Sequence, residues 1–255
     1  MVPLRPLLPA LMALACLLVG APLGAAPSPV APSPAAPSPA ALEAALNDPA
    51  PTSLAAVFEP GPGFAPAELE ARRAALRERF PDLRWQVAPG TPLNDGRPTL
   101  EISVSGSRQE GPTRYRMVAN ERVALHSHGD RFNGQDVIRE SSLVRSGSKD
   151  LAVTLVLPDA VLTGQRYDLD VVVDEPLDGA VLAGAVAAVA PSQLLQSAMP
   201  ELQLEALGGG GIFKTVQAPR DPGSQTWAVL LVHPDGIVTA TKRVRVVADK
   251  AALAP

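Results

Sequence analysis

Apolar residues recur at helical spacing near residue 70. Leu69, Leu76 and Phe80 fall on one face of a helix, which lets that face pack on a sheet. We expect this helix to start at Pro66, because proline is tolerated in a first helical turn, and to stop before Pro81. Before it, the apolar spacing predicts a short helix near residues 42–46 and a second short segment at 54–58.

Beyond residue 99 the period changes to two, which predicts half-buried strands. In the segment 100–105 every apolar residue is followed by a polar one. Similar alternation predicts further strands at 114–119, 122–128 and 137–144. Helices followed by a meander of strands predict a small α+β module at 42–148, with its helices packed on a curved antiparallel sheet.

Strand signals are denser in the last hundred residues. They fall at 151–157, 167–173, 181–189, 202–207, 212–216, 227–232 and 237–247, with Pro-Asp and Asp-Gly turn signals between them. Short strands at this spacing predict an all-β, immunoglobulin-like sandwich at 149–248, followed by a tail at 249–255. The segment 227–232 is apolar on both faces, so we expect it to be a central strand.

The first residues predict export from the cytoplasm. No charge occurs from Pro6 to Ala26, in a run rich in Leu and Ala, so residues 1–26 are a signal peptide or a retained N-terminal anchor. Small residues favour cleavage near 24–26. Cys16 is a candidate lipidation site; alternatively it is discarded with the signal, which leaves a mature chain without cysteine.

The signal is followed by a proline-rich segment. Pro-Ser-Pro recurs in residues 27–41, which predicts an extended, solvated tether rather than part of a core.

The net charge of −4 and pI near 5.4 give no electrostatic reason to expect a nucleic-acid partner. No serine elbow or phosphate loop is complete, so the sequence predicts no catalytic residue and no cofactor.

His126 and His128 are the most suggestive pair for metal binding. Residues two apart on a strand point the same way, and two imidazoles can begin a zinc site. Zinc normally needs at least three protein ligands, and no third ligand lies nearby in the sequence. We therefore favour solvated histidines at a strand end.

Asp168, Asp170 and Asp174 form an acidic cluster on one face of the segment 167–174, opposite Leu169, Val171 and Val173, which we expect to face the core. Several carboxylates together can bind calcium, but the spacing describes equally well the wet face of an edge strand.

Arg243 and Arg245 likewise alternate on one strand. A basic stripe can bind an anionic partner, but a solvated strand face is our default interpretation.

Several short motifs resemble uncharacterised exported proteins of cyanobacteria. They are Arg145-Ser146-Gly147, the segment 158–164, the segment 174–177 and His233-Pro234-Asp235-Gly236. The resemblance implies the periplasm or the thylakoid lumen and brings no known activity. The order of elements from 42 to 147 also resembles an NTF2-like cone.

Two functions follow as expectations. The first is a non-enzymatic binding or assembly protein, tethered at a membrane through its N-terminus, whose sandwich presents a surface or edge strand to a protein partner. The second is a small-molecule carrier or enzyme that uses a pocket inside the α+β module, where Tyr115 and Met117 lie on one strand.

Overall fold

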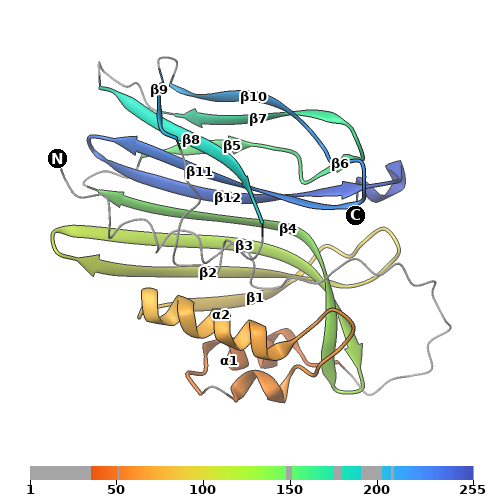
Figure 1. Cartoon of the computed structure of the whole chain (residues 1–255). Helices are drawn as coiled ribbons and strands as arrows, with labels where there is room; N and C mark the ends of the chain where they lie inside the picture. The colour runs from red at the N-terminus through yellow and green to blue at the C-terminus, as the bar shows by residue number, and fades with distance from the viewer. Residues whose placement is uncertain are drawn as a thin grey trace.

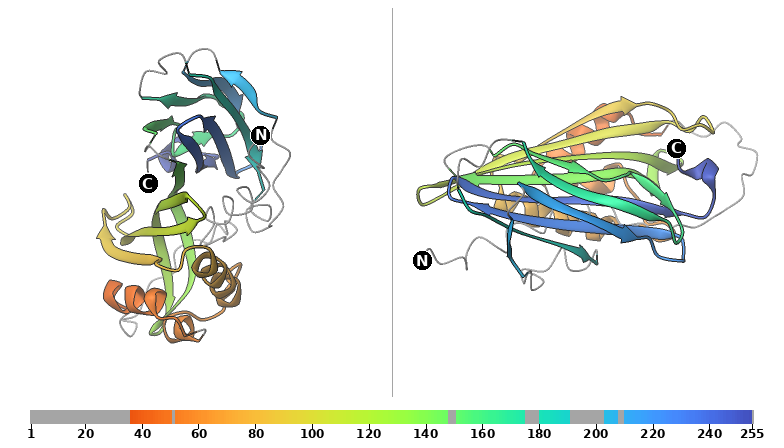
Figure 2. Two further views of the ribbon diagram at one scale, coloured as in Figure 1. Left: turned by 90° about the vertical axis from the view of Figure 1, so that its left-hand side faces the viewer. Right: turned by 90° about the horizontal axis from the view of Figure 1, so that it is seen from above.

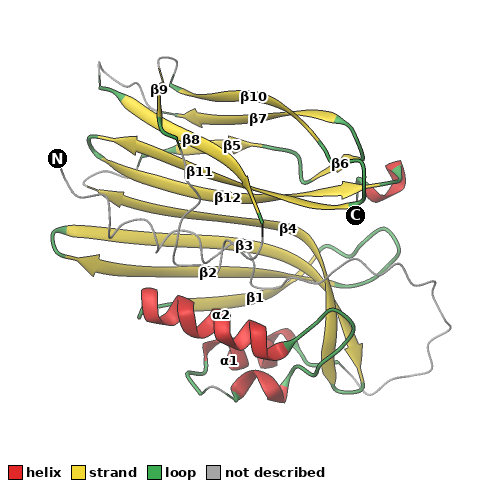
Figure 3. Ribbon diagram, viewed as in Figure 1, coloured by secondary structure: helices red, strands yellow, loops and turns green. Residues whose placement is uncertain are grey.

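Two helices open the described part of the chain (Figure 3). The computed structural model describes residues 36–50, 52–147, 151–174, 180–190, 203–207 and 210–254. Helix α1 spans Pro39–Asn47, the 3-10 turn η1 spans Ser53–Ala56, and α2 spans Pro66–Arg79. The helix start expected at Pro66 is therefore confirmed. The signal segment, Cys16 and most of the tether lie outside the described residues.

The rest of the described chain is mostly antiparallel β-sheet, and the sheet is not closed into a barrel. One sheet of nine strands has the order β1-β2-β3-β4-β12-β11-β8-β9, with β6 parallel to β12. Its members are β1 (Arg84–Gly90), β2 (Thr99–Glu110), β3 (Thr113–His128), β4 (Arg131–Gly147), β6 (Ala160–Leu162), β8 (Leu182–Val189), β9 (Glu205–Leu207), β11 (Gly223–His233) and β12 (Gly236–Val247). A second sheet of three strands has the order β10-β7-β5, with β10 at Gly211–Gln217, β7 at Arg166–Val173 and β5 at Val153–Val156.

The helices and the three-stranded sheet cover opposite faces of the long sheet (Figures 1 and 2). Val144 of β4 packs in the core beneath the helices, whereas its neighbour Leu143 packs in the core beneath the three-stranded sheet. Consecutive strand residues point to opposite faces, so one strand contributes to both cores. We call these two sides the helix face and the sandwich face.

The core on the sandwich face follows the expected pattern. Leu169 and Val171 of β7 are fully buried, and Val229 of the central strand β11 lies opposite them. Trp227 also lies in this core, where its Nε1 donates a hydrogen bond to Tyr167 Oη at 2.8 Å. The expected burial of alternate residues in β7, and the central position of β11, are both confirmed.

Two features of the strands differ from expectation. The segments 114–119 and 122–128 are one continuous strand, β3, and neither β1 nor the short β6 was expected. Gly147 to Ser141 of β4 pair with Gly236 to Lys242 of β12, so the long sheet joins strands of the first part of the chain to strands of the last hundred residues. None of the helices in the described ranges is both long and apolar enough to cross a membrane.

Candidate ligand-binding cleft

A β-bulge in β4 opens the sheet at one end. Arg139 pairs with Arg122 of β3, but Val137 pairs with the next residue, Val123, so Ile138 is an extra residue without a partner in this ladder. Such a bulge bends its strand. The pairing of β4 with β12 ends at Ser141 and Lys242, and the hairpin of β3 and β4 then swings towards the helices (Figure 1).

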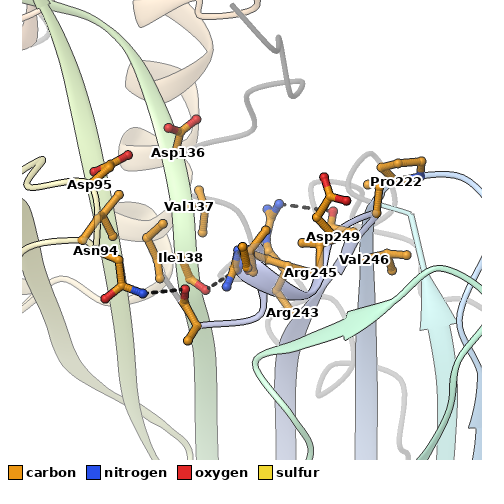
Figure 4. A pocket seen from close by; sticks show the side chains of 18 of the residues that line it. Asn94, Asp95, Asp136, Val137, Ile138, Pro222, Arg243, Arg245, Val246 and Asp249 are labelled. Carbon is orange, nitrogen blue, oxygen red and sulfur yellow. Dashed lines mark hydrogen bonds between the residues drawn. The ribbon is translucent and has the colours of Figure 1, made fainter. Parts of the chain in front are cut away.

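The space between the diverging strands is a cleft of about 620 Å³ (Figure 4). This volume lies within the range of about 300–1,000 Å³ that is usual for small-ligand sites. One wall comes from β4, at residues 135–138, and the other from the end of β12. The loop at 93–97 and the segment 248–254 complete it. We call this space the β4–β12 cleft.

Arg245 joins the two walls. Its Nε donates to the carbonyl oxygen of Ile138, the bulged residue, at 3.1 Å. Its Nη1 and Nη2 donate to the carbonyl oxygens of Ala252 and Leu253, at 3.2 and 3.4 Å. In the described residues no carboxylate forms an ion pair with it. Burial lowers the pKa of Arg245, although a guanidinium keeps its proton in any protein.

Gln135 is the feature of the cleft that most needs an explanation. Gln135 is the cross-strand partner of Leu125 of β3, which packs on the core of the helix face. Cross-strand partners project from the same face of a sheet, so the side chain of Gln135 also projects from the helix face. Gln135 is 7% exposed, and neither its amide nitrogen nor its amide oxygen has a hydrogen-bond partner. A buried amide left in this state costs about 1–3 kcal/mol, so the protein loses stability by keeping it there.

Buried charges lie behind the cleft on the same face. Glu121 of β3 is directly opposite Glu140 of β4, and Glu140 Oε2 accepts a hydrogen bond of 2.7 Å from Nε of Arg243. All three side chains are at most 7% exposed. Burial raises the pKa of Glu121 well above its usual value, and Glu140 raises it further, while Arg243 and Arg72 lower it.

The charges that line the cleft are balanced. Its acidic residues are Asp95, Asp136 and Asp249, and its basic residues are Arg97, Arg243 and Arg245. Arg97 donates to both Asp95 and Asp136. Although burial would raise the pKa of Asp136, the hydrogen bonds from Arg97 and His126 hold it below its usual value. The cleft therefore has no strong preference for an anion or a cation.

The two histidines considered for zinc are directed to different carboxylates. His126 Nε2 lies 3.1 Å from Asp136, and His128 Nδ1 lies 2.8 Å from Glu59. The register shift opposite His126 and Ser127 leaves Asn133 of β4 as an extra residue. Within the ranges that the structure describes, no three side chains of His, Cys, Asp or Glu are grouped to hold a metal ion.

The acidic cluster lies on the outer face of β7. Asp168 accepts a hydrogen bond from Thr215, and Asp174 accepts one from Thr154, each at 2.9 Å. Asp170 lies in a cross-strand row between Val156 of β5 and Phe213 of β10. These carboxylates therefore sit on the open side of the three-stranded sheet, away from the β4–β12 cleft.

Our default interpretation of the two arginines as a solvated strand face is wrong. Arg243 is 7% exposed and Arg245 is half-buried. Their alternation with valine was visible in the sequence, but the bulge that brings Ile138 to Arg245 was not. The role of Gln135 carries no sequence signal either, because a lone glutamine in an alternating strand looks like any solvated position.

The interior beneath the helices is filled. The space between Leu42, Trp85, Ile102 and Glu121 measures only about 10 Å³, which is room for one water molecule at most. Tyr115 and Met117 are fully buried there as part of the core. The cleft outside this core is the larger space.

Two comparisons bear on relatives of this chain. A comparison with curated proteins finds no match. The part of the chain from residue 148 to residue 247, which includes β5 to β12, matches the model of a domain of unknown function (DUF8623).

Proposed function

We propose that this protein is an exported, non-enzymatic binding protein whose ligand occupies the β4–β12 cleft. The observation that carries the proposal is Gln135, a residue of the wall of a 620 Å³ cleft whose side-chain amide is buried and has no hydrogen-bond partner at either polar atom. Buried polar groups in proteins are nearly always hydrogen-bonded, and an exception calls for a missing partner. A ligand that bonds to this amide supplies one.

A binding role is favoured over a catalytic one by the chemistry of the walls. The arginines donate to carbonyl, carboxylate and hydroxyl oxygens, and Asp136 is engaged by both Arg97 and His126. No nucleophile with an adjacent base stands among the residues that line the cleft. These groups can orient and hold a ligand without exchanging protons with it.

Thermal unfolding of the full chain tests the proposal. Amides, carboxylates, sugars and phosphates are added class by class, and a bound compound raises Tm by mass action. We expect at least one class to raise Tm of the natural chain more than that of Gln135→Leu. If every class shifts the two proteins equally, the cleft is not the binding site.

A protein partner on the sandwich is the second candidate, favoured by the outer face of the three-stranded sheet. Val156 is 51% exposed and Phe213 is 60% exposed, and Asp170 lies between them. Exposed apolar side chains beside carboxylates suit a partner with apolar and basic residues. Crosslinking in native membrane extracts tests this: a specific partner should be lost with Phe213→Lys, and equal recovery with both proteins would contradict it.

The finer fold and the compartment belong to the same proposal. Two sheets packed face to face around Trp227 support an immunoglobulin-like sandwich for the last hundred residues. Helices before a curved sheet support the likeness of the first part to an NTF2-like cone. The uncharged run at the start of the chain supports export to the periplasm or thylakoid lumen, with a tether at the membrane.

A further inference from the structure

The β4–β12 cleft already binds peptide backbone. Arg245 donates to the carbonyl oxygens of Ala252 and Leu253, and Asn94 Nδ2 donates to that of Ala254 at 3.1 Å. Three consecutive carbonyl groups of one segment are therefore held by side chains of the cleft. The side chains of that segment are small or apolar and make no ion pair with the walls in the described residues.

The cleft also exposes the edge of a strand. From Gly134 to Glu140, no strand in the described residues pairs with the edge of β4 that faces β12. Further along the same strand, Phe132 exchanges backbone hydrogen bonds with Val57 and Glu59. This exchange shows that an extended segment from elsewhere in the chain can add to β4. An unpaired edge is a template for a further strand.

Gln135 lies on this open stretch and has the chemistry of a peptide group. Its amide nitrogen is a donor and its amide oxygen an acceptor, and both are unpartnered. An extended residue offers the complementary acceptor and donor on one side of the chain, because its own N–H and C=O point the same way. An ionised carboxylate offers acceptors only, and would leave the oxygen of Gln135 without a partner.

The balance of charge points the same way. The three acidic and three basic side chains of the lining give no net charge, and most of the remaining lining is apolar. We infer that the ligand of the cleft is an extended, uncharged peptide segment of a partner protein, which adds to the free edge of β4 and bonds to the amide of Gln135. This inference rests on the proposed function, because it names the ligand class of the same site.

The test uses the full chain labelled with ¹⁵N and the peptide acetyl-Ala-Ala-Leu-Ala-amide. This peptide copies residues 251–254, whose backbone the cleft already contacts. We expect saturable shifts of the Gln135 side-chain amide and of the backbone amides from 134 to 140. A matched peptide with one ester in place of an amide should bind more weakly, because it lacks one donor.

Two variants separate Gln135 from general effects of the substitution. Gln135→Leu should weaken binding of the peptide by about ten- to a hundredfold, the loss expected for the two hydrogen bonds of the amide. Gln86→Leu makes the same change at an exposed position of β1 and should bind as the natural chain does.

The remaining outcomes overturn the inference. If acetate or inorganic phosphate shifts the Gln135 amide and the peptide does not, the ligand is an anion; the peptide class is then wrong while the cleft remains a binding site. If the peptide causes no saturable shift up to about 10 mM, weaker than any useful recognition, the inference also fails. The proposed function is then decided separately by the panel of compounds.

Discussion

The buried pair of Arg243 and Glu140 should be the most sensitive charged site in the long sheet. Arg243 is 7% exposed, and its Nε lies 2.7 Å from Glu140 Oε2. Arg243→Met keeps much of the side chain's length and removes the charge. Glu140 then shares a buried site with Glu121 and has lost its hydrogen bond from Arg243.

The size of the effect follows from desolvation. Removing one partner of a buried ion pair costs about 3–5 kcal/mol, because the other charge remains out of water. A typical domain is stable by about 5–15 kcal/mol, so this loss is a large part of the total. With an m-value of about 2 kcal/mol/M, the midpoint of urea unfolding should fall by about 2 M.

Urea unfolding at pH 7 measures the loss, and two further variants calibrate it. Arg166→Met makes the same change at an exposed position of β7 and should alter the stability by less than about 0.5 kcal/mol. The double variant Arg243→Met/Glu140→Met removes both charges and should recover most of the loss.

Acidic pH provides the internal check. In Arg243→Met the pKa of Glu140 should rise further, since burial already raises it and Arg243 opposes that rise. When the pKa of a glutamate is higher in the folded than in the unfolded protein, the folded protein is most stable below the unfolded-state pKa of about 4.3. The free energy of unfolding then falls as the pH rises towards the folded-state pKa. The variant should therefore lose less at pH 4 than at pH 7. A loss under about 1 kcal/mol at pH 7, or no recovery in the double variant, would refute the reasoning.

Three further changes test other parts of the account. Glu121→Gln should remove part of the fall in stability above pH 4.5, because burial raises the pKa of Glu121 in the folded state only; unchanged pH dependence of Tm would contradict this. Gly147→Ala should cost about 1–3 kcal/mol in urea unfolding, since Gly147 has a φ of 123° and a Cβ would lie 2.1 Å from the Asp235 carbonyl oxygen; a neutral result would contradict this. Arg245→Met should release the segment 250–254, so trypsin should cleave after Lys250 faster, and an unchanged rate would show that Arg245 does not hold it.

Local patterns predicted much of the fold because each reflects a local cause. Proline in a first turn marks the start of α2, and the alternation in β7 separates its buried valines from its aspartates. The strand β6 was missed because three residues carry too little alternation to identify a strand.

The candidate site could not be predicted because it depends on distant pairings. The alternation in β12 separates the two faces of the strand, but it does not tell whether the polar face meets water. Arg243 is buried because Glu140 of β4, 103 residues away in the sequence, lies beside it. The cleft in turn depends on one extra residue, Ile138, and a bulge of this kind leaves no clear mark in an alternating sequence.

The most direct test of the central claim is the free energy of unfolding of Gln135→Leu, measured in urea without any ligand. If Gln135 is kept for binding, its buried amide lowers the stability of the empty protein, and leucine should raise the free energy of unfolding by about 1 kcal/mol. A variant that is instead less stable by 1 kcal/mol or more would show that Gln135 is part of the structural core. The β4–β12 cleft would then lose the observation that marks it as a binding site.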